Sequence, residues 1–153
     1  MRIGYLWRRA VVAAVATLAV AAPAAATQPQ ATTFALDGHF TGPSTIAGTW
    51  TATGVVNDAG SYTETFRFAG ETVHVEKLLT GSQGTIILRA NAVVNWISAC
   101  TATFRAGAWQ ITGRTGTYEG LTGGGAPAAE AAGYGDVCTG EIHLIHEGQA
   151  HID

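Results

Sequence analysis

The stretch RTGTYEGLTGGG, residues 114–125, contains five glycines among threonines and a single tyrosine. Such a cluster invites comparison with phosphate-binding loops. A Walker loop, however, requires a lysine followed by serine or threonine after its last glycine, and this stretch has no lysine. No helix start follows that could direct its amide groups at a phosphate. The glycines therefore predict sharp turns between β-strands, with Tyr118 and Leu121 as packing anchors.

The chain on either side of this stretch alternates apolar and polar residues with period two, and turn residues separate the alternating runs. This pattern is typical of an antiparallel β protein, and eight strands in one domain indicate a closed barrel or a sandwich. The segment 126–134, APAAEAAGY, is small and contains proline, which predicts a surface loop. The predicted strands are 33–41, 46–56, 61–68, 72–80, 85–94, 97–105, 108–114 and 137–147.

Three turns set the register of the central strands: a three-residue loop with a bulge at 57–60, a two-residue loop at 69–70, and a turn at 81–84. A further hairpin is predicted to turn at 106–107. The resulting opposite pairs are Val56 with Tyr62, Phe68 with Glu71, Thr80 with Thr85, and Glu76 with Arg89. One face of the sheet then collects the apolar side chains and predicts the core. Its members are Trp50, Ala52, Val56, Tyr62, Phe66, Phe68, Val73, Val75, Leu79, Ile86, Leu88 and Ala90, joined by Cys100, Ala102, Phe104, Trp109 and Ile111 from the later hairpin.

Two charged residues, Glu64 and Lys77, lie in the apolar register. The predicted pairing sets Glu64 opposite Val75, so that Lys77 is its diagonal neighbour, and sets Tyr62 directly opposite Lys77. Buried charges are costly unless they are paired, and acids and bases in apolar pockets are typical of general acid–base sites. Glu64, Lys77 and Tyr62 are therefore the candidate catalytic residues. The alternative is a structural ion pair, or side chains that extend to the barrel mouth.

The C-terminal region is rich in potential metal ligands. A strand would place Glu141 and His143 on one face and His146 on the other, and two groups on one face do not make a zinc site. We therefore predict no metal ligands and interpret the cluster, which also contains Glu147 and His151, as a terminal strand with a polar tail. The sequence has no Gly-x-Ser-x-Gly, His-Glu-x-x-His or Cys-x-x-Cys motif of a hydrolase, metalloprotease or redox site.

The N-terminus predicts export. Arg2, Arg8 and Arg9 precede an apolar run at 10–22, and Ala-Ala-Ala at 24–26 forms a cleavage site. The alternative, a transmembrane anchor, requires roughly 20 residues. We therefore predict a signal peptide at 1–26 and a single secreted domain at 27–153 with no membrane segment. Its remaining basic residues are scattered along an acidic chain, which disfavours nucleic-acid binding.

Cys100 and Cys138 are the two cysteines of the chain. In an oxidising compartment a disulfide between them is expected, and closing this loop would stabilise the fold by about 4 kcal/mol. The alternative, a pair of metal ligands, lacks a second pair at suitable spacing.

Residues 111–125 follow a predicted strand and contain the motif Gly-x-x-Gly-x-Tyr-x-Gly-x-x-Gly at 113–123. This motif resembles the late-strand signature of the allene oxide cyclase and dirigent-like β-barrels, as well as secreted bacterial proteins of this length. The resemblance implies an antiparallel eight-stranded β-barrel (calycin-like, allene oxide cyclase-like) with an apolar cavity, often assembled as a homo-oligomer. It also implies cyclisation or stereochemical guidance of apolar molecules without a metal or organic cofactor, and it assigns no catalytic residue.

Three functions follow as hypotheses. The first is a binding protein for a small apolar molecule held inside the barrel and oriented by Tyr62, Glu64 and Lys77. The second is a cofactor-independent isomerase or cyclase in which Glu64 is the acid–base group and Lys77 or Tyr62 stabilises developing charge. The third is a non-catalytic extracellular interaction protein with a filled interior. The predicted ligand-binding residues are Trp50, Phe66, Trp96, Phe104 and Trp109.

Overall fold

The computed structural model describes residues 27–125 and 131–153, and every regular element except one short 3-10 turn is a β-strand. The predicted signal peptide and residues 126–130 of the predicted loop lie outside the described residues. The elements are β1 (Gln30–Gly42), β2 (Thr45–Thr53), β3 (Asp58–Ala69), β4 (Thr72–Gly81), β5 (Thr85–Trp96), β6 (Thr101–Arg114), η1 (Gly116–Tyr118), β7 (Leu121–Gly125), β8 (Ala131–Asp136) and β9 (Glu141–Ile152).

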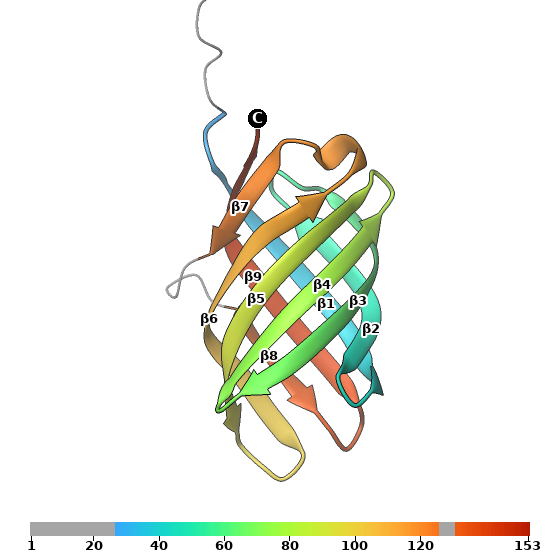
Figure 1. Cartoon of the computed structure of the whole chain (residues 1–153), viewed down its shortest axis with the longest axis vertical. Helices are drawn as coiled ribbons and strands as arrows, with labels where there is room; N and C mark the ends of the chain where they lie inside the picture. The colour runs from blue at the N-terminus through green and yellow to red at the C-terminus, as the bar shows by residue number, and fades with distance from the viewer. Residues whose placement is uncertain (1–26, 126–130) are drawn as a thin grey trace, which may run out of the picture.

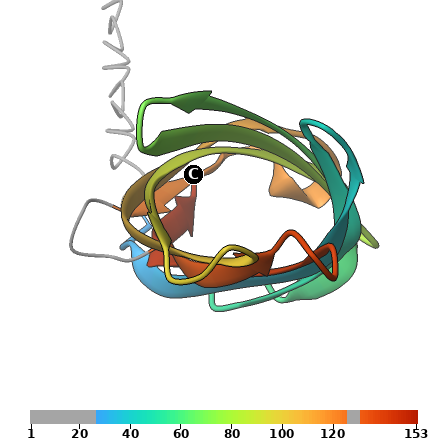
Figure 2. The same ribbon diagram turned by 90° about the horizontal axis from the view of Figure 1, so that it is seen from below.

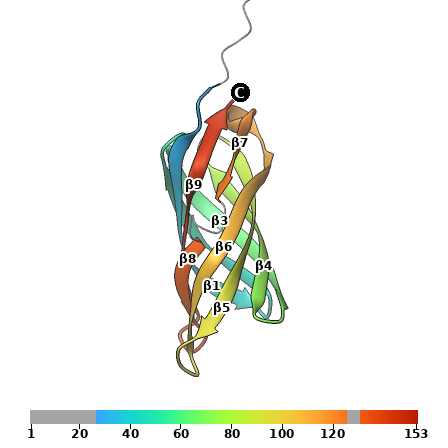
Figure 3. The same ribbon diagram turned by 90° about the vertical axis from the view of Figure 1, so that its left-hand side faces the viewer.

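The strands form one closed antiparallel barrel, as predicted (Figure 1). Each strand from β1 to β6 pairs with the next, and β1 pairs with β9 to close the ring, which Figure 2 shows from one end. The position between β6 and β9 is shared by two short strands, because β7 and β8 each pair with both neighbours at different heights (Figure 3). The barrel thus has eight strand positions and one extra strand. No helix in the described ranges has the length and hydropathy to cross a membrane.

The predicted register of β4 with β5 is confirmed: Thr80 faces Thr85, and Glu76 faces Arg89. The predicted register of β3 with β4 is wrong by two residues. The tight turn consists of Gly70 and Glu71, with Gly70 at φ +64°, rather than of residues 69–70. A left-handed residue at the first turn position suits the right-handed twist of a two-residue hairpin.

The predicted register of β2 with β3 is also wrong, because the loop lies before residue 58 rather than at 57–60, and Trp50 faces Gly60. Asp58 begins β3 and uses its side chain to accept hydrogen bonds from Ser82 and Tyr118. These partners are distant in sequence, so the local turn pattern could not reveal them. Both predicted registers differ from the observed ones by an even number of residues, so the same side chains still point into the barrel.

Two predictions about the second half of the chain are wrong. Residues 106–107 are not a hairpin turn, because β6 continues through them, and Ala106 at φ +53° accompanies a β-bulge opposite β5. The turn lies instead between β5 and β6, at residues 97–100. Residues 131–134 of the predicted loop belong to β8, which β6 and β9 hydrogen-bond from both sides. Neighbouring strands, rather than its own Ala- and Gly-rich sequence, make this segment a strand.

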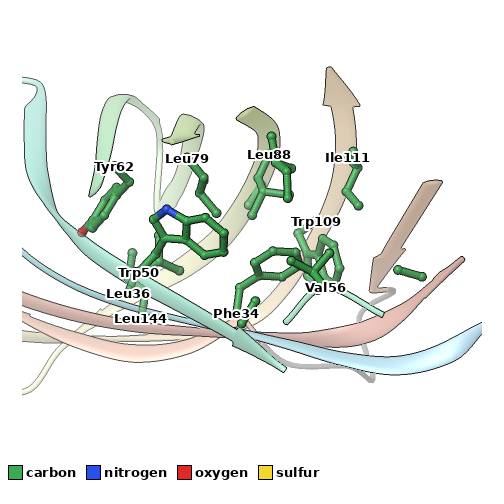
Figure 4. Close-up of a cluster of buried hydrophobic side chains, with 14 of the residues drawn as sticks. Phe34, Leu36, Trp50, Val56, Tyr62, Leu79, Leu88, Trp109, Ile111 and Leu144 are labelled. Atoms are coloured by element: carbon green, nitrogen blue, oxygen red, sulfur yellow. The ribbon is translucent and has the colours of Figure 1, made fainter. Parts of the chain in front are cut away.

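The barrel interior contains two apolar clusters. The larger one is centred on Trp50, Phe34 and Trp109 and is closely packed (Figure 4). The smaller one lies near the end of the barrel where β3 turns into β4 and consists of Val73, Ala92, Val94 and Ala102. Two members of the predicted core lie outside both clusters. Cys100 lies in the turn before β6, and Phe68 is 55% exposed because β3 runs on past Thr45, where its pairing with β2 ends.

The glycines of residues 114–125 serve the turn and the close packing of β7. Gly120 has φ +84°, a conformation that side chains disfavour, and it redirects the chain from η1 into β7. Gly125 lies against the indole of Trp109, where a Cβ would collide with the ring nitrogen. Tyr118 and Leu121 are 3% and 0% exposed, which confirms them as packing anchors.

The disulfide between Cys100 and Cys138 is confirmed, with the two Cα atoms 5.3 Å apart. Cys100 directly precedes β6, and Cys138 lies in the turn between β8 and β9. The bond therefore links two loops at one end of the barrel rather than two strands. The amide of Val137 donates to the carbonyl of Cys100 at 2.8 Å beside it.

At the opposite end, Asp58 joins three segments of the chain. Its carboxylate accepts hydrogen bonds from the Tyr118 hydroxyl at 2.5 Å, the Ser82 hydroxyl at 2.8 Å and the Gln83 amide at 3.2 Å. These bonds, the one from Tyr118 most of all, lower the pKa of Asp58 to about 2. Hydrogen bonds to the ionised form thus hold this end of the barrel together.

We predict that Tyr118→Phe raises the pKa of Asp58 toward its ordinary value, because the largest contribution to its depression is removed. Carboxyl chemical shifts followed by NMR through an acid titration measure this pKa. Because the folded-state pKa is depressed, the stabilisation from Asp58 is present above the unfolded pKa and is lost as the pH falls toward 2. Ser82→Ala, the matched control, should shift the pKa less. An Asp58 pKa that is equal in parent and Tyr118→Phe would contradict the prediction.

Candidate functional site

Glu64 and Lys77 form a buried ion pair inside the barrel. They face each other directly across β3 and β4, and the Lys77 Nζ donates to the Glu64 Oε2 at 2.5 Å. Their side chains are 2% and 1% exposed. Burial lowers the pKa of Lys77, and the adjacent Glu64 carboxylate opposes this shift by favouring the charged ammonium. The two residues therefore meet as predicted, although as direct rather than diagonal neighbours.

Tyr62 is buried one inward position before Glu64 on β3, and it faces Leu79 rather than Lys77, contrary to the predicted register. Its hydroxyl lies against Gly38, which lacks the Cβ that would occupy this space. Figure 4 shows the phenol at one edge of the large apolar cluster. The hydroxyl has no hydrogen-bond partner in the described part of the chain. Burial raises the pKa of Tyr62, and the charges of Glu64 and Asp37 add to the effect.

His146 on β9 is a further buried polar residue. It lies on the predicted face, opposite to that of Glu141 and His143, but its burial inside the barrel was not predicted. It is 2% exposed, and neither ring nitrogen has a hydrogen-bond partner among residues 27–125 and 131–153. Burial lowers its pKa well below the ordinary value, and the charge of Lys77 lowers it further. The signal that could have revealed it is the alternation of Ile142, Leu144 and His146, which places all three inside the barrel.

A cavity of about 60 Å³ lies inside the barrel between these polar residues and one end of the barrel. Glu64 and His146 are part of its lining, and nearly all the rest is apolar. Phe68 is both a lining residue and 55% exposed, so the cavity opens at the end where β3 meets β4. We call this end the mouth. The other lining residues are Phe40, Ile46, Phe66, Val73, Val75, Ala90, Asn91, Ala92, Phe104, Ile142 and Leu144.

The five predicted ligand-binding residues divide into three groups. Phe66 and Phe104 line the cavity. Trp50 and Trp109 are core residues instead, and their indole N–H groups donate to the carbonyls of Thr80 at 3.2 Å and Glu147 at 2.8 Å. Trp96 is 53% exposed and lies beyond the end of the barrel wall, beside Phe68 in a surface hollow of about 370 Å³. It is therefore not an interior residue, because its strand continues past the mouth.

A hollow of about 710 Å³ lies on the outer surface of β3 to β6. Its polar side chains include Glu76 and Arg89, whose ion pair is 2.7 Å long and whose side chains are 49% and 63% exposed. A pair this exposed contributes little to stability. His74 faces Asn91 on the same surface. This hollow is a solvated sheet face, so the interior cavity is the better candidate site despite its smaller size.

One group of potential metal ligands occurs within the described ranges, and it consists of Cys100, Asp136 and Cys138. The two sulfurs are bonded to each other, so they are not metal ligands in this state. Asp136 instead accepts hydrogen bonds from the amides of Cys138 and Thr139 at 2.8 and 3.0 Å. His143 also has a partner, because its Nδ1 contacts the carboxylate of Asp37 on the outer surface.

The site combines a neutral ion pair with a neutral imidazole. Glu64 and Lys77 cancel each other's charge, and burial keeps His146 unprotonated. The neutral imidazole has one N–H donor and one bare acceptor nitrogen. The cavity can therefore offer hydrogen bonds to a guest without a net charge.

Comparison with protein-family models, curated proteins and solved structures finds no match to this chain. The resemblance to the allene oxide cyclase and dirigent-like barrels therefore stays a prediction. The geometry of the cavity and its polar residues is the basis for a functional proposal.

We predict that Glu64→Leu and Lys77→Met each lower the free energy of unfolding by about 3–5 kcal/mol, because each leaves a buried charge without its partner. The double variant should recover to parental stability or above, since apolar side chains of similar volume avoid the desolvation cost. Urea unfolding followed by tryptophan fluorescence measures all four proteins. If the two losses simply add in the double variant, the charges are not coupled as the 2.5 Å contact requires.

Because the pKa of His146 is lowered in the folded protein, we predict that the free energy of unfolding decreases on acidification. Below about pH 6.5 the unfolded chain binds a proton on this histidine and the folded chain does not, so the free energy of unfolding falls with pH. The slope from this one group approaches about 1.4 kcal/mol per pH unit. Urea unfolding of the parent and His146→Leu between pH 7.5 and 5.5 measures it. The variant should lack this slope, and equal slopes in the two proteins would contradict the prediction.

Proposed function

We propose that the protein is a secreted β-barrel that binds a small apolar molecule in its interior. The observation that carries this proposal is the cavity at the mouth, which has an apolar wall and two buried polar residues, Glu64 and His146. Ligand sites typically combine an apolar lining with a few polar groups that orient the guest. The disulfide supports secretion, since such bonds persist in oxidising compartments.

The size of the cavity limits the ligand. A volume of about 60 Å³ accommodates roughly five water-sized groups, whereas sites for drug-sized molecules measure roughly 300–1,000 Å³. The ligand is therefore either very small or inserts one end and leaves the rest at the mouth. The exposed ring of Phe68 continues the apolar surface outward for such a ligand.

The packed half of the barrel provides a rigid support for this site. Trp50, Phe34 and Trp109 fill the interior behind the polar residues, and both indole N–H groups are hydrogen-bonded. A ligand can therefore reach the cavity from the mouth, where Phe68 is exposed. The ring of Trp109 lies 6.3 Å from that of His146 and limits the movement of the imidazole toward the core.

A cofactor-independent isomerase or cyclase is the second candidate. It is favoured by His146, because a neutral imidazole that lines a cavity can accept a proton from a bound substrate. The proton would leave the substrate and form a bond to a ring nitrogen, and its return to another substrate atom would complete an isomerisation. Glu64, the second polar lining residue, would lie beside the reacting group with Lys77 bonded to it, in keeping with the proposed kinship to cyclase and dirigent-like barrels.

The binding proposal is tested by NMR titration of the protein with methylcyclohexane, an uncharged probe that is larger than the cavity and can insert one end from the mouth. We expect shifts confined to methyl groups of the cavity, such as those of Val73, Ala90 and Ala92. Ala92→Leu should abolish them because its side chain fills the cavity, whereas Ala59→Leu, at an exposed position of β3, should not.

An absence of shifts up to the solubility limit of the probe would refute the proposal and leave an interaction protein with a filled interior. The enzyme alternative has a separate test, which is conversion of a ligand that co-purifies with the protein from its own host. Turnover that is unchanged in both Glu64→Gln and His146→Leu would exclude the acid–base roles given above.

A further inference from the structure

The two ring nitrogens of His146 are the buried polar atoms of the cavity lining that lack a protein partner. They have no hydrogen bond within the described residues, although the side chain is 2% exposed. A buried polar group without a hydrogen-bond partner destabilises the folded state by roughly 1–3 kcal/mol. Since His146 also lines the cavity, a guest molecule can supply the missing bond.

The charges around the cavity restrict what this guest can be. Lys77 on β4 already donates to Glu64 on β3, and the two charges cancel. Trp109 on β6, whose ring is tilted by 43° to that of His146, contributes no charge. Phe34 on β1, which faces His146 in register, contributes none either. A carboxylate or an ammonium on the ligand would thus be a buried charge with no counter-ion of its own, which costs several kcal/mol.

The bonding capacity of the imidazole narrows the choice further. Neutral histidine has one N–H and one bare nitrogen, and either nitrogen can be the donor. A hydroxyl can donate to the bare nitrogen or accept from the N–H, and a carbonyl oxygen can accept from the N–H. A primary amide would bring two N–H donors and a carbonyl, which is more than the one donor and one acceptor of the imidazole can satisfy.

Resting on the proposed function, we propose that the ligand is an uncharged apolar molecule that bears one oxygen function, a hydroxyl or a carbonyl, and that this oxygen is hydrogen-bonded to His146. Its apolar body lies against Phe66, Phe104 and the other apolar lining residues and points toward the mouth. His146 is therefore the residue that selects an oxygenated ligand over a hydrocarbon. Glu64 and Lys77 act by excluding ions.

The test compares probes that share one ring: cyclohexanol, cyclohexanone, methylcyclohexane, cyclohexanecarboxylate and cyclohexylammonium. Dissociation constants are measured by NMR titration at pH 7.5 for the parent and for His146→Leu. We expect the variant to bind cyclohexanol and cyclohexanone roughly fivefold more weakly, which is the factor that one hydrogen bond provides. Its affinity for methylcyclohexane should be unchanged or higher. The two charged probes should bind the parent most weakly.

A measurement on the parent alone keeps the inference testable if His146→Leu folds poorly. The ¹⁵N shifts of the His146 ring should change with cyclohexanol and cyclohexanone and stay constant with methylcyclohexane. The ring shifts also distinguish the two oxygen functions, since a ketone requires the N–H to face it and a hydroxyl accepts either tautomer.

The outcomes separate this inference from the function on which it rests. If no probe binds, the proposed ligand-binding function itself fails. If methylcyclohexane binds and the affinity for cyclohexanol is the same in parent and His146→Leu, the cavity binds apolar molecules but His146 does not select them. If either charged probe binds more tightly than cyclohexanol, the cavity does not exclude ions, and the inference is wrong.

Discussion

The pairing of β1 with β9 is the constraint on which the rest of the structure depends. Ten residues of β1, Gln30 to His39, pair with β9 and join the two ends of the sheet. Once the sheet is closed, every inward side chain must share one narrow interior, and none can turn to solvent except at the ends. Closure also removes the free edges through which sheets aggregate. A charged residue in an inward register is therefore forced into the barrel, where it needs a partner.

Glu64 and Lys77 meet this requirement by facing each other, and their position divides the interior. Beyond them on one side, the large cluster around Trp50 is closely packed. On the other side, smaller residues such as Ala92 and Ala102 leave space near the mouth. The barrel thus has a packed half that gives stability and a looser half that can accept a guest. Asp58 and its partners close the first end, and the disulfide links two loops at the second.

Some strand registers of this barrel depend on local turns and others on contacts between residues far apart in the sequence. The register of β4 with β5 could be predicted because its turn is local and regular. The register of β2 with β3 could not, since Asp58 bonds to Ser82 and Tyr118, which lie far along the chain. β8 could not be predicted either, because its small residues have little strand preference and are held by β6 and β9. The burial of His146 was not predicted, because histidine is a polar residue type, although its position continues the inward series of Ile142 and Leu144.

By itself, the sequence determined that the chain is all-β, that Glu64 and Lys77 share its interior, and that Cys100 bonds to Cys138. The first two features follow from the two-residue period of strands, which survives any register error of an even number of residues. The strand pattern left a barrel and a sandwich open, and the disulfide follows from the presence of two cysteines in a chain with a predicted export signal. The tertiary structure alone decided that His146 lines the cavity together with Glu64, that Trp50 and Trp109 do not line it, and that the cavity is small. Those outcomes depend on how strands distant in sequence pack around one closed interior, and no local pattern encodes that packing.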